Sequence, residues 1–239
     1  MRIEGLNENM LLKCQNIGFQ YPDSDTHVFK DLTCELSGPG FYALFGPSGV
    51  GKTTLAKMMA GELTVFSGKI IVEHMHRVLY SYNLERIPGW CSAGDHLYEV
   101  TPDSSRDHFD DLVGSFGLQA CLESRFAKLS LGQQNRVNLA RYLLQDFDLL
   151  IMDESLANVD EVTRERIILK IKGIFSTKCF LYISHNVLEV SKFCKEIIVL
   201  RDPQKSPRAV SVRGQNLSQG EALKKNDLEF TMLEVMHAS

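Results

Sequence analysis

The first forty residues alternate apolar and polar positions in the manner of β-strands. Residues 11–21 and 27–36 are rich in aromatic and branched apolar side chains, and the polar stretch 22–25 separates them. Strands joined by a connection this short pair antiparallel. The pattern therefore predicts that the chain starts with an antiparallel β unit.

After Pro39 and Gly40 the pattern changes to an apolar strand, a turn of glycine or polar residues and an amphipathic helix, and this unit repeats. The expected strands are 41–45, 149–152 and 179–183, and the helices that follow them are 53–59, 160–174 and 186–193. Such alternation predicts a mostly parallel sheet flanked by helices, the α/β class.

The segment between Thr101 and Leu144 shows no strand pattern, and its expected helices are 105–116, 120–126 and 131–144. We therefore expect one domain over 1–239, with a helical subdomain inserted at about 84–145. The expected elements of the C-terminal part are strands at 197–200 and 209–212 and a closing helix at 221–236.

Composition and charge exclude several classes of protein. The 239 residues are 44% hydrophobic and 23% charged, with a net charge of −4. No run of basic residues is present, which argues against a nucleic-acid partner and against a polybasic membrane anchor. The six cysteines are scattered, so we expect reduced thiols. The first residues lack the apolar run of a secretory signal, and we expect a cytoplasmic chain.

The segment from Gly46 to Thr53 matches G-x-x-x-x-G-K-[ST], the phosphate-binding loop, between a strand and a helix. Its backbone N–H groups surround phosphates, Lys52 reaches the β- and γ-phosphates, and the Thr53 hydroxyl binds Mg²⁺. The alternative is an ordinary glycine-rich turn. The candidate nucleotide-binding residues are Gly46, Pro47, Ser48, Gly49, Val50, Gly51, Lys52, Thr53 and Thr54.

An apolar strand at 149–152 leads into Asp153 and Glu154. At the carboxyl end of a strand beside a phosphate loop, Asp153 is placed to hold Mg²⁺, and Glu154 to accept a proton from the attacking water. The alternative is a strand that ends in two solvated acids. His185 follows the strand 179–183 at the same edge, where it could contact the γ-phosphate and orient Glu154. Tyr21 offers a ring for stacking on adenine, or it is an ordinary strand aromatic.

Ser130 and Gln133 form an S-x-x-Q capping box at the start of the helix 131–144. This helix is about 20 Å long and its far end leads toward Asp153, so Ser130 is expected to lie far from its own chain's nucleotide. If the helix start binds phosphate, the nucleotide belongs to another subunit. A head-to-tail pair with two shared sites follows as a hypothesis.

Together these motifs resemble the nucleotide-binding subunits of ABC (ATP-binding cassette) transporters, over about residues 11–200. Residues 153–160 (D-E-S-L-A-N-V-D) align with the family's D-E-P-F-S-A-L-D, and 183–186 are similar to its V-T-H-D. The resemblance implies the ABC ATPase fold with a P-loop NTPase core and hydrolysis of ATP with Mg²⁺. It also implies contact with the partner subunit's nucleotide through Ser130, Gly132, Gln133 and Asp160.

Within the family, residues 83–90 (N-L-E-R-I-P-G-W) resemble the Q-E-P-R-L-L-P-W stretch of the nitrate, sulfonate and taurine importers, a group that also serves thiamine-precursor uptake. This implies an integral membrane permease, contacted near 83–97 and the helical insert, on the inner face of the cell membrane. It also implies an extracytoplasmic solute-binding protein. Trp90 as a plain core aromatic is the alternative.

Three residues depart from the family pattern. Asn83 stands at the place of a glutamine; it is one methylene shorter but keeps an amide oxygen for Mg²⁺, so the rate or the coupling is expected to be lower. Leu131 replaces a glycine, with little expected effect, and Ser155 replaces a proline, which is expected to loosen the turn after Glu154. An exporter subunit, a soluble scaffold ATPase without a permease and a weakly hydrolysing regulatory cassette remain alternatives.

Overall fold

The antiparallel unit expected at the start of the chain is present in the computed structural model, which describes residues 10–83, 85–87 and 89–239. Strands β1 (Leu11–Gln20) and β2 (His27–Ser37) pair antiparallel, and Cys14 lies directly opposite Cys34. These two cysteines, 20 positions apart in the sequence, are therefore neighbours in the sheet, and both are free thiols. A third strand, β4 (Ser67–Glu73), pairs with the other edge of β1 and was not predicted.

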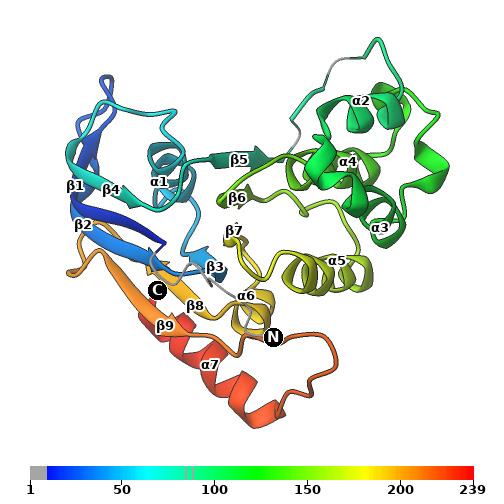
Figure 1. The fold of residues 1–239 in the computed structure, drawn as a ribbon. Helices are drawn as coiled ribbons and strands as arrows, with labels where there is room; N and C mark the ends of the chain where they lie inside the picture. The colour runs from blue at the N-terminus through cyan, green and yellow to red at the C-terminus, as the bar shows by residue number, and fades with distance from the viewer. Residues whose placement is uncertain (1–9, 84, 88) are drawn as a thin grey trace.

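The main sheet has the order β5-β6-β7-β3-β8-β9 (Figure 1). The strands β5 (Val78–Tyr82), β6 (Leu149–Asp153), β7 (Cys179–Ile183), β3 (Gly40–Phe45) and β8 (Glu196–Leu200) are parallel. Only the edge strand β9 (Ala209–Arg213) is antiparallel among the described strands of this sheet. The mostly parallel sheet is confirmed, and it places the carboxyl ends of β3, β6 and β7 side by side.

Two hydrophobic cores lie on the two faces of this sheet, because consecutive side chains of a strand point to opposite faces. From β3, Tyr42 and Leu44 pack in the core shared with helix α1 (Lys52–Met59) and the antiparallel sheet. Phe41 and Ala43 pack in the other core, with α5 (Glu161–Ile174) and α6 (Val187–Phe193). The strand therefore holds its position from both sides.

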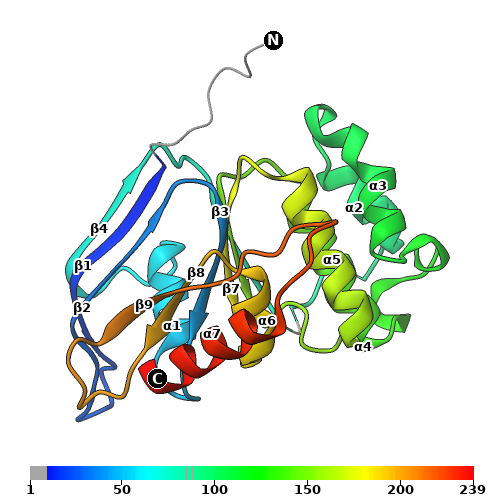
Figure 2. The same ribbon diagram turned by 90° about the horizontal axis from the view of Figure 1, so that it is seen from below.

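The helical insert lies between β5 and β6, at the end of the molecule opposite the antiparallel sheet (Figures 1 and 2). It contains α2 (Ala93–Val100), α3 (Phe109–Ser115), α4 (Leu131–Leu143) and the short 3₁₀ turns η1 (Asp103–His108), η2 (Gln119–Cys121) and η3 (Phe126–Lys128). Within the described part of the chain, no helix is long and apolar enough to cross a membrane.

The helix expected at 120–126 is wrong. Carbonyl groups in this stretch accept hydrogen bonds from the start of α2: Ala93 N–H donates to Ser124 O (2.8 Å) and Gly94 N–H to Leu122 O (2.9 Å). These hydrogen bonds connect the stretch to α2, and the stretch forms the 3₁₀ turn η2 followed by turns in place of a regular helix.

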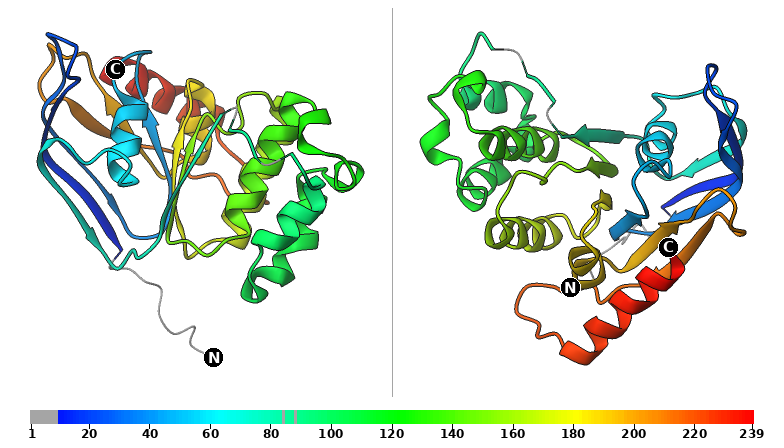
Figure 3. Two further views of the ribbon diagram at one scale, coloured as in Figure 1. Left: turned by 90° about the horizontal axis from the view of Figure 1, so that it is seen from above. Right: turned by 180° about the vertical axis from the view of Figure 1, so that it is seen from behind.

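The closing helix α7 (Lys225–Ala238) starts four residues later than the expected 221 and packs beside α6 and β9 (Figure 3). The late start has a local cause, because the Glu221 carboxylate accepts from the Ser218 N–H at 2.8 Å and closes a turn there.

Candidate nucleotide site

The phosphate loop joins the end of β3 to the start of α1. Gly51 has φ +106°, and a Cβ built on it would lie 2.7 Å from the Phe29 ring, so only glycine fits. Lys52 is 6% exposed, and burial lowers its pKa. Its Nζ donates to Gly46 O (2.8 Å) and Pro47 O (2.9 Å). The ammonium group is therefore held inside the loop that is expected to surround the phosphates.

Asp153 ends β6 and is 6% exposed. Its Oδ2 accepts from the Thr53 hydroxyl at 2.7 Å and from the Tyr80 hydroxyl at 2.9 Å. Thr53 and Asp153, both predicted as magnesium ligands, are thus brought together, and their hydroxyl and carboxylate oxygens are the ligands that Mg²⁺ prefers. Tyr80, from β5, is a member of this site that the sequence did not indicate.

A cavity of about 420 Å³ opens at this point. It is lined by Thr53, Lys57, Glu62, Tyr80, Tyr82, Asn83, Asp153 and Glu154.

Glu154 and His185 come from the ends of neighbouring strands and contact each other. Glu154 Oε1 lies 2.5 Å from His185 Nε2, and the Glu154 N–H donates to Ile183 O at 3.1 Å. Both side chains remain partly exposed to solvent. The pair that was expected to orient the attacking water is therefore assembled in the structure.

A buried carboxylate lies behind His185. Glu189 is 5% exposed and accepts from Ser184 Oγ (3.3 Å) and Asn186 Nδ2 (3.1 Å), the residues on either side of His185. It also pairs with Arg164 at 2.9 Å, and Arg164 donates to Val159 O at 2.9 Å. This network connects the His185 loop to the segment before Asp160, and the sequence analysis did not identify it.

Asn83 lies at the edge of the cavity, but its amide oxygen is already occupied. Oδ1 accepts from Asn135 Nδ2 on α4 (2.9 Å) and from Asn158 Nδ2 (3.1 Å), while the Asn83 N–H donates to Asp153 O (3.0 Å). In this arrangement Asn83 links α4, the 153–160 segment and β6. Its expected role as a magnesium ligand would require that one of the two amide donors move away.

Ser155 lies in the turn after Glu154. This side chain is 2% exposed, and its hydroxyl lies 3.0 Å from both Ser81 O and Ser81 Oγ on β5. These hydrogen bonds connect the turn to the neighbouring strand β5.

The capping box at the start of α4 is formed as predicted. Ser130 Oγ accepts from the Gln133 N–H (3.3 Å), and Gln133 Oε1 accepts from the Ser130 N–H (2.8 Å). A Cβ on Gly132 would lie 2.5 Å from Asn158 O, so the two segments touch at the backbone. Asp160 caps α5, and the Thr163 N–H at 2.9 Å lowers the pKa of its carboxyl group. Ser130, Gly132, Gln133 and Asp160 are all absent from the lining of the cavity beside Asp153.

Tyr21 lies next to the phosphate loop's helix. Its hydroxyl is 2.9 Å from the Thr54 hydroxyl, its ring packs edge-on against Phe19, and 46% of the residue is exposed. Of residues 83–90, Leu84 and Pro88 lie outside the described residues. Trp90 is 79% exposed, so the alternative that it is a core aromatic is wrong.

Comparison with known proteins gives consistent findings. A family model described as ABC transporter matches residues 29–157. The chain is 30% identical over 215 residues to the taurine import ATP-binding protein TauB of Roseobacter denitrificans, covering 82% of this chain and 77% of that protein.

Two further matches agree. The molybdenum import ATP-binding protein ModC of Brucella melitensis is 32% identical over 67% of this chain and 50% of its own length. A solved bacterial Atm1-family ABC exporter with ATP bound is 21% identical, with a TM-score of 0.72 over 81% of this chain and 38% of that one. This last likeness supports the predicted fold.

Proposed function

The chain belongs to the ABC transporter family, as an ATP-hydrolysing subunit, and on that premise we propose that it energises an importer of a small solute. The observation that carries the proposal is the meeting of Lys52, Asp153, Glu154 and His185 at one edge of the main sheet. Import, rather than export, is supported by the similarity to import proteins for taurine and molybdenum. We place the solute in the nitrate, sulfonate, taurine or thiamine-precursor class, because residues 83–90 resemble that group.

The proposed reaction depends mainly on positioning and charge. Lys52 exchanges its two carbonyl partners for phosphate oxygens, and the loop amides add further donors. Thr53 and Asp153 would hold Mg²⁺, which neutralises charge on the β- and γ-phosphates. Glu154 accepts a hydrogen bond from the attacking water, and His185 keeps the carboxylate in place at 2.5 Å.

The second half of the nucleotide contact comes, in this proposal, from a second copy of the chain. Ser130, Gly132, Gln133 and Asp160 lie away from the chain's own cavity but beside one another, because Gly132 abuts Asn158. A head-to-tail dimer would place this surface over the partner's phosphate loop. Each of the two sites would then need both chains.

The permease is proposed to contact the segment around Trp90 and the helical insert, on the inner face of the cell membrane. The indole of Trp90 is 79% exposed, a large apolar group available for a partner. An extracytoplasmic solute-binding protein completes the proposed importer.

The test is to tag the chain in its host, extract membranes in mild detergent and identify the co-purifying proteins by mass spectrometry. A multi-span permease with a solute-binding protein supports an importer, and a permease of an exporter type overturns import. Soluble partners alone, under conditions that retain other cassettes, overturn the transporter role.

Trp90→Ala provides a variant of this experiment. It should lower recovery of the permease without changing ATP binding. The matched control is Phe230→Ala, which removes an aromatic side chain that is also exposed (63%) but lies on α7.

A further inference from the structure

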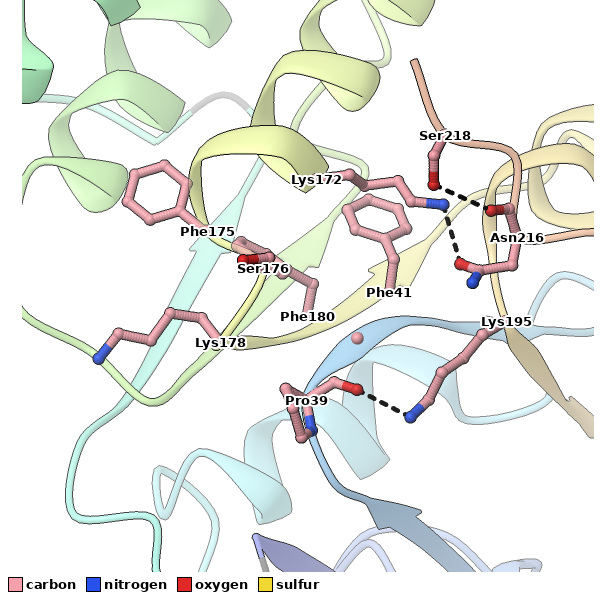
Figure 4. Close-up of a pocket in the computed structure, with 11 residues that line it drawn as sticks. Pro39, Phe41, Lys172, Phe175, Ser176, Lys178, Phe180, Lys195, Asn216 and Ser218 are labelled. Carbon is pink, nitrogen blue, oxygen red and sulfur yellow. Dashed lines mark hydrogen bonds between the residues drawn. The ribbon is translucent and has the colours of Figure 1, made fainter. Parts of the chain in front are cut away.

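A second cavity lies at the opposite edge of the main sheet from the phosphate loop. Its volume is about 230 Å³. It is bounded by the first residues of β3, the start of β7, the end of α5 and residues 216–218, as Figure 4 shows. No part of the nucleotide site described above reaches it.

Three lysines line this cavity, and no acidic side chain does so within the described chain. Lys172 Nζ donates to Phe193 O (2.6 Å), Asn216 Oδ1 (2.9 Å) and Leu217 O (2.7 Å). Lys195 Nζ donates to Ser37 O (3.1 Å) and Pro39 O (2.8 Å). All five acceptors are neutral, and neither lysine forms an ion pair with a described residue. Lys178 differs, because Asp148 and Asp146 lie 3.5 Å and 3.7 Å away.

The same molecule contains a lysine in the same condition, at a site whose ligand class is indicated by its motif. Lys52 of the phosphate loop has no ion pair with a described residue either, and its Nζ donates to two backbone carbonyls; it is buried, whereas Lys172 and Lys195 are half-buried. Carbonyl oxygens stabilise an ammonium group less than a negative charge does, so such a lysine gains when an anion enters. Lys195 also donates to two backbone carbonyls, and its Nζ lies 4.3 Å from the centroid of the Tyr42 ring, a neutral cation–π partner.

Aromatic side chains form the apolar part of the cavity. Phe41 and Phe180 are 1% and 2% exposed, their ring centroids are 5.6 Å apart, and Phe175 packs against Phe180. Figure 4 shows the Lys172 amine beside Asn216 and the Lys195 amine beside Pro39, with the phenylalanine side chains next to them. The partly exposed ring of Phe175 next to two lysines without a carboxylate partner suits a ligand with one apolar and one anionic end.

We propose that this cavity binds a small organic anion, whose charged oxygens accept hydrogen bonds from Lys172 and Lys195 and whose apolar body packs against Phe175, the partly exposed ring that lies on the buried Phe180. Lys195 exchanges its contact with the Tyr42 ring for a hydrogen bond to the ligand, and Lys172 exchanges the Asn216 side chain for the ligand. Burial already lowers the pKa of Lys172 to about 8 and lowers that of Lys195, as expected for cations without a counter-charge.

The first test is calorimetric titration with benzenesulfonate, after the nucleotide site has been saturated with Mg-ADP. Wild-type protein should bind this probe with millimolar or better affinity and at least about tenfold more tightly than it binds sulfate. Lys195→Met should weaken binding at least about tenfold. The control is Lys170→Met, on the same helix as Lys172 but paired with Asp111 outside the cavity, which should change little. Absence of binding, equal affinity for sulfate, or binding unchanged in Lys195→Met overturns the proposal.

A second measurement uses only the wild-type chain, in case a lysine variant fails to fold. The rate at which an amine-acylating reagent modifies each lysine is followed by mass spectrometry at pH 8. Benzenesulfonate should slow modification of Lys172 and Lys195 several-fold and leave Lys170 unchanged. Equal rates at Lys172 and Lys195 with and without the probe contradict the site.

Discussion

The backbone of Glu154 has φ +51°, the left-handed conformation that residues other than glycine rarely adopt. Such a backbone costs about 1–3 kcal/mol and persists where surrounding contacts fix it. Here the Glu154 N–H bonds to Ile183 O, and the next residue, Ser155, is fixed to Ser81. These contacts fix the backbone at Glu154, and the contact with His185 at 2.5 Å holds the carboxylate.

Replacing this carboxylate tests its role directly. Glu154→Gln keeps the shape but removes the base, so we expect ATP turnover to fall at least about 100-fold while ATP still binds. Phosphate release measures the first quantity and nucleotide titration the second. Glu161→Gln, an exposed acid at the start of α5, should leave both unchanged. Undiminished ATP turnover in Glu154→Gln would contradict the assignment of Glu154 as the catalytic base.

Lys172 makes stability depend on pH in a defined direction. Its pKa is about 8 in the folded chain against 10.5 ordinarily, so between these values the unfolded chain binds more protons. Stability contributed at this residue therefore rises as pH increases from 8 toward 10.5. Relative to Lys172→Met, the wild type should gain about 1–2 kcal/mol in its free energy of unfolding between pH 7 and 10. Urea unfolding at several pH values measures this, and a constant difference would refute it.

At the scale of single residues, local sequence motifs predicted much of the candidate site. The contacts between residues far apart in the sequence were not predicted. The phosphate loop, Asp153, Glu154 and His185 were found because each occupies a fixed place next to a strand end. Asn135 and Asn158 could not be found, because they reach Asn83 from 52 and 75 positions along the chain. Their contact is made only by the packing of α4 on the strand ends.

Among the elements, the start of α4 is the one most sensitive to added volume. Gly132→Ala would place a Cβ 2.5 Å from Asn158 O, a backbone atom with little room to move, so we expect a loss of about 1–3 kcal/mol in stability. Gly173→Ala, near the end of α5, meets nothing within 4 Å and should raise stability by about 0.5–1 kcal/mol. Thermal unfolding of both variants checks the pair. A harmless Gly132→Ala would show that the Asn158 segment can retreat.

Elements with a strong local hydrophobic signal were predicted well, whatever their length, and elements whose signal depends on partners elsewhere in the chain were not. The strands 41–45 and 179–183 are continuous apolar runs buried on both faces, a signal that needs no context. Helix α2, eight residues long, was not predicted, and its local signal is the capping box of Ser92 and Asp95. Strand β4 has only partly buried and exposed side chains, so its sequence resembles a loop until β1 is beside it.

For the whole molecule, the proposed dimer makes a prediction that separates the interface from the fold. Glu154→Gln with Mg-ATP should elute as a dimer in size-exclusion chromatography with light scattering. Adding Ser130→Arg should prevent this, because an arginine at the helix start occupies the place of the partner's phosphates. Ser104→Arg, an exposed position elsewhere in the helical insert, should still allow the dimer. A dimer that survives Ser130→Arg would rule out the head-to-tail arrangement.

Strand β3 has a consequence that concerns both of its ends. The strand begins at Gly40, in the wall of the cavity lined by Lys172, Lys178 and Lys195, and ends at Phe45, directly before the phosphate loop. Its length is about 20 Å. Thermodynamic reciprocity applies to any two ligands that bind to the same molecule, whatever the distance between their sites. If an anion in the cavity alters ATP affinity by some factor, ATP alters the affinity for that anion by the same factor. Titrating the anion with and without ATP, and ATP with and without the anion, must then give the same factor.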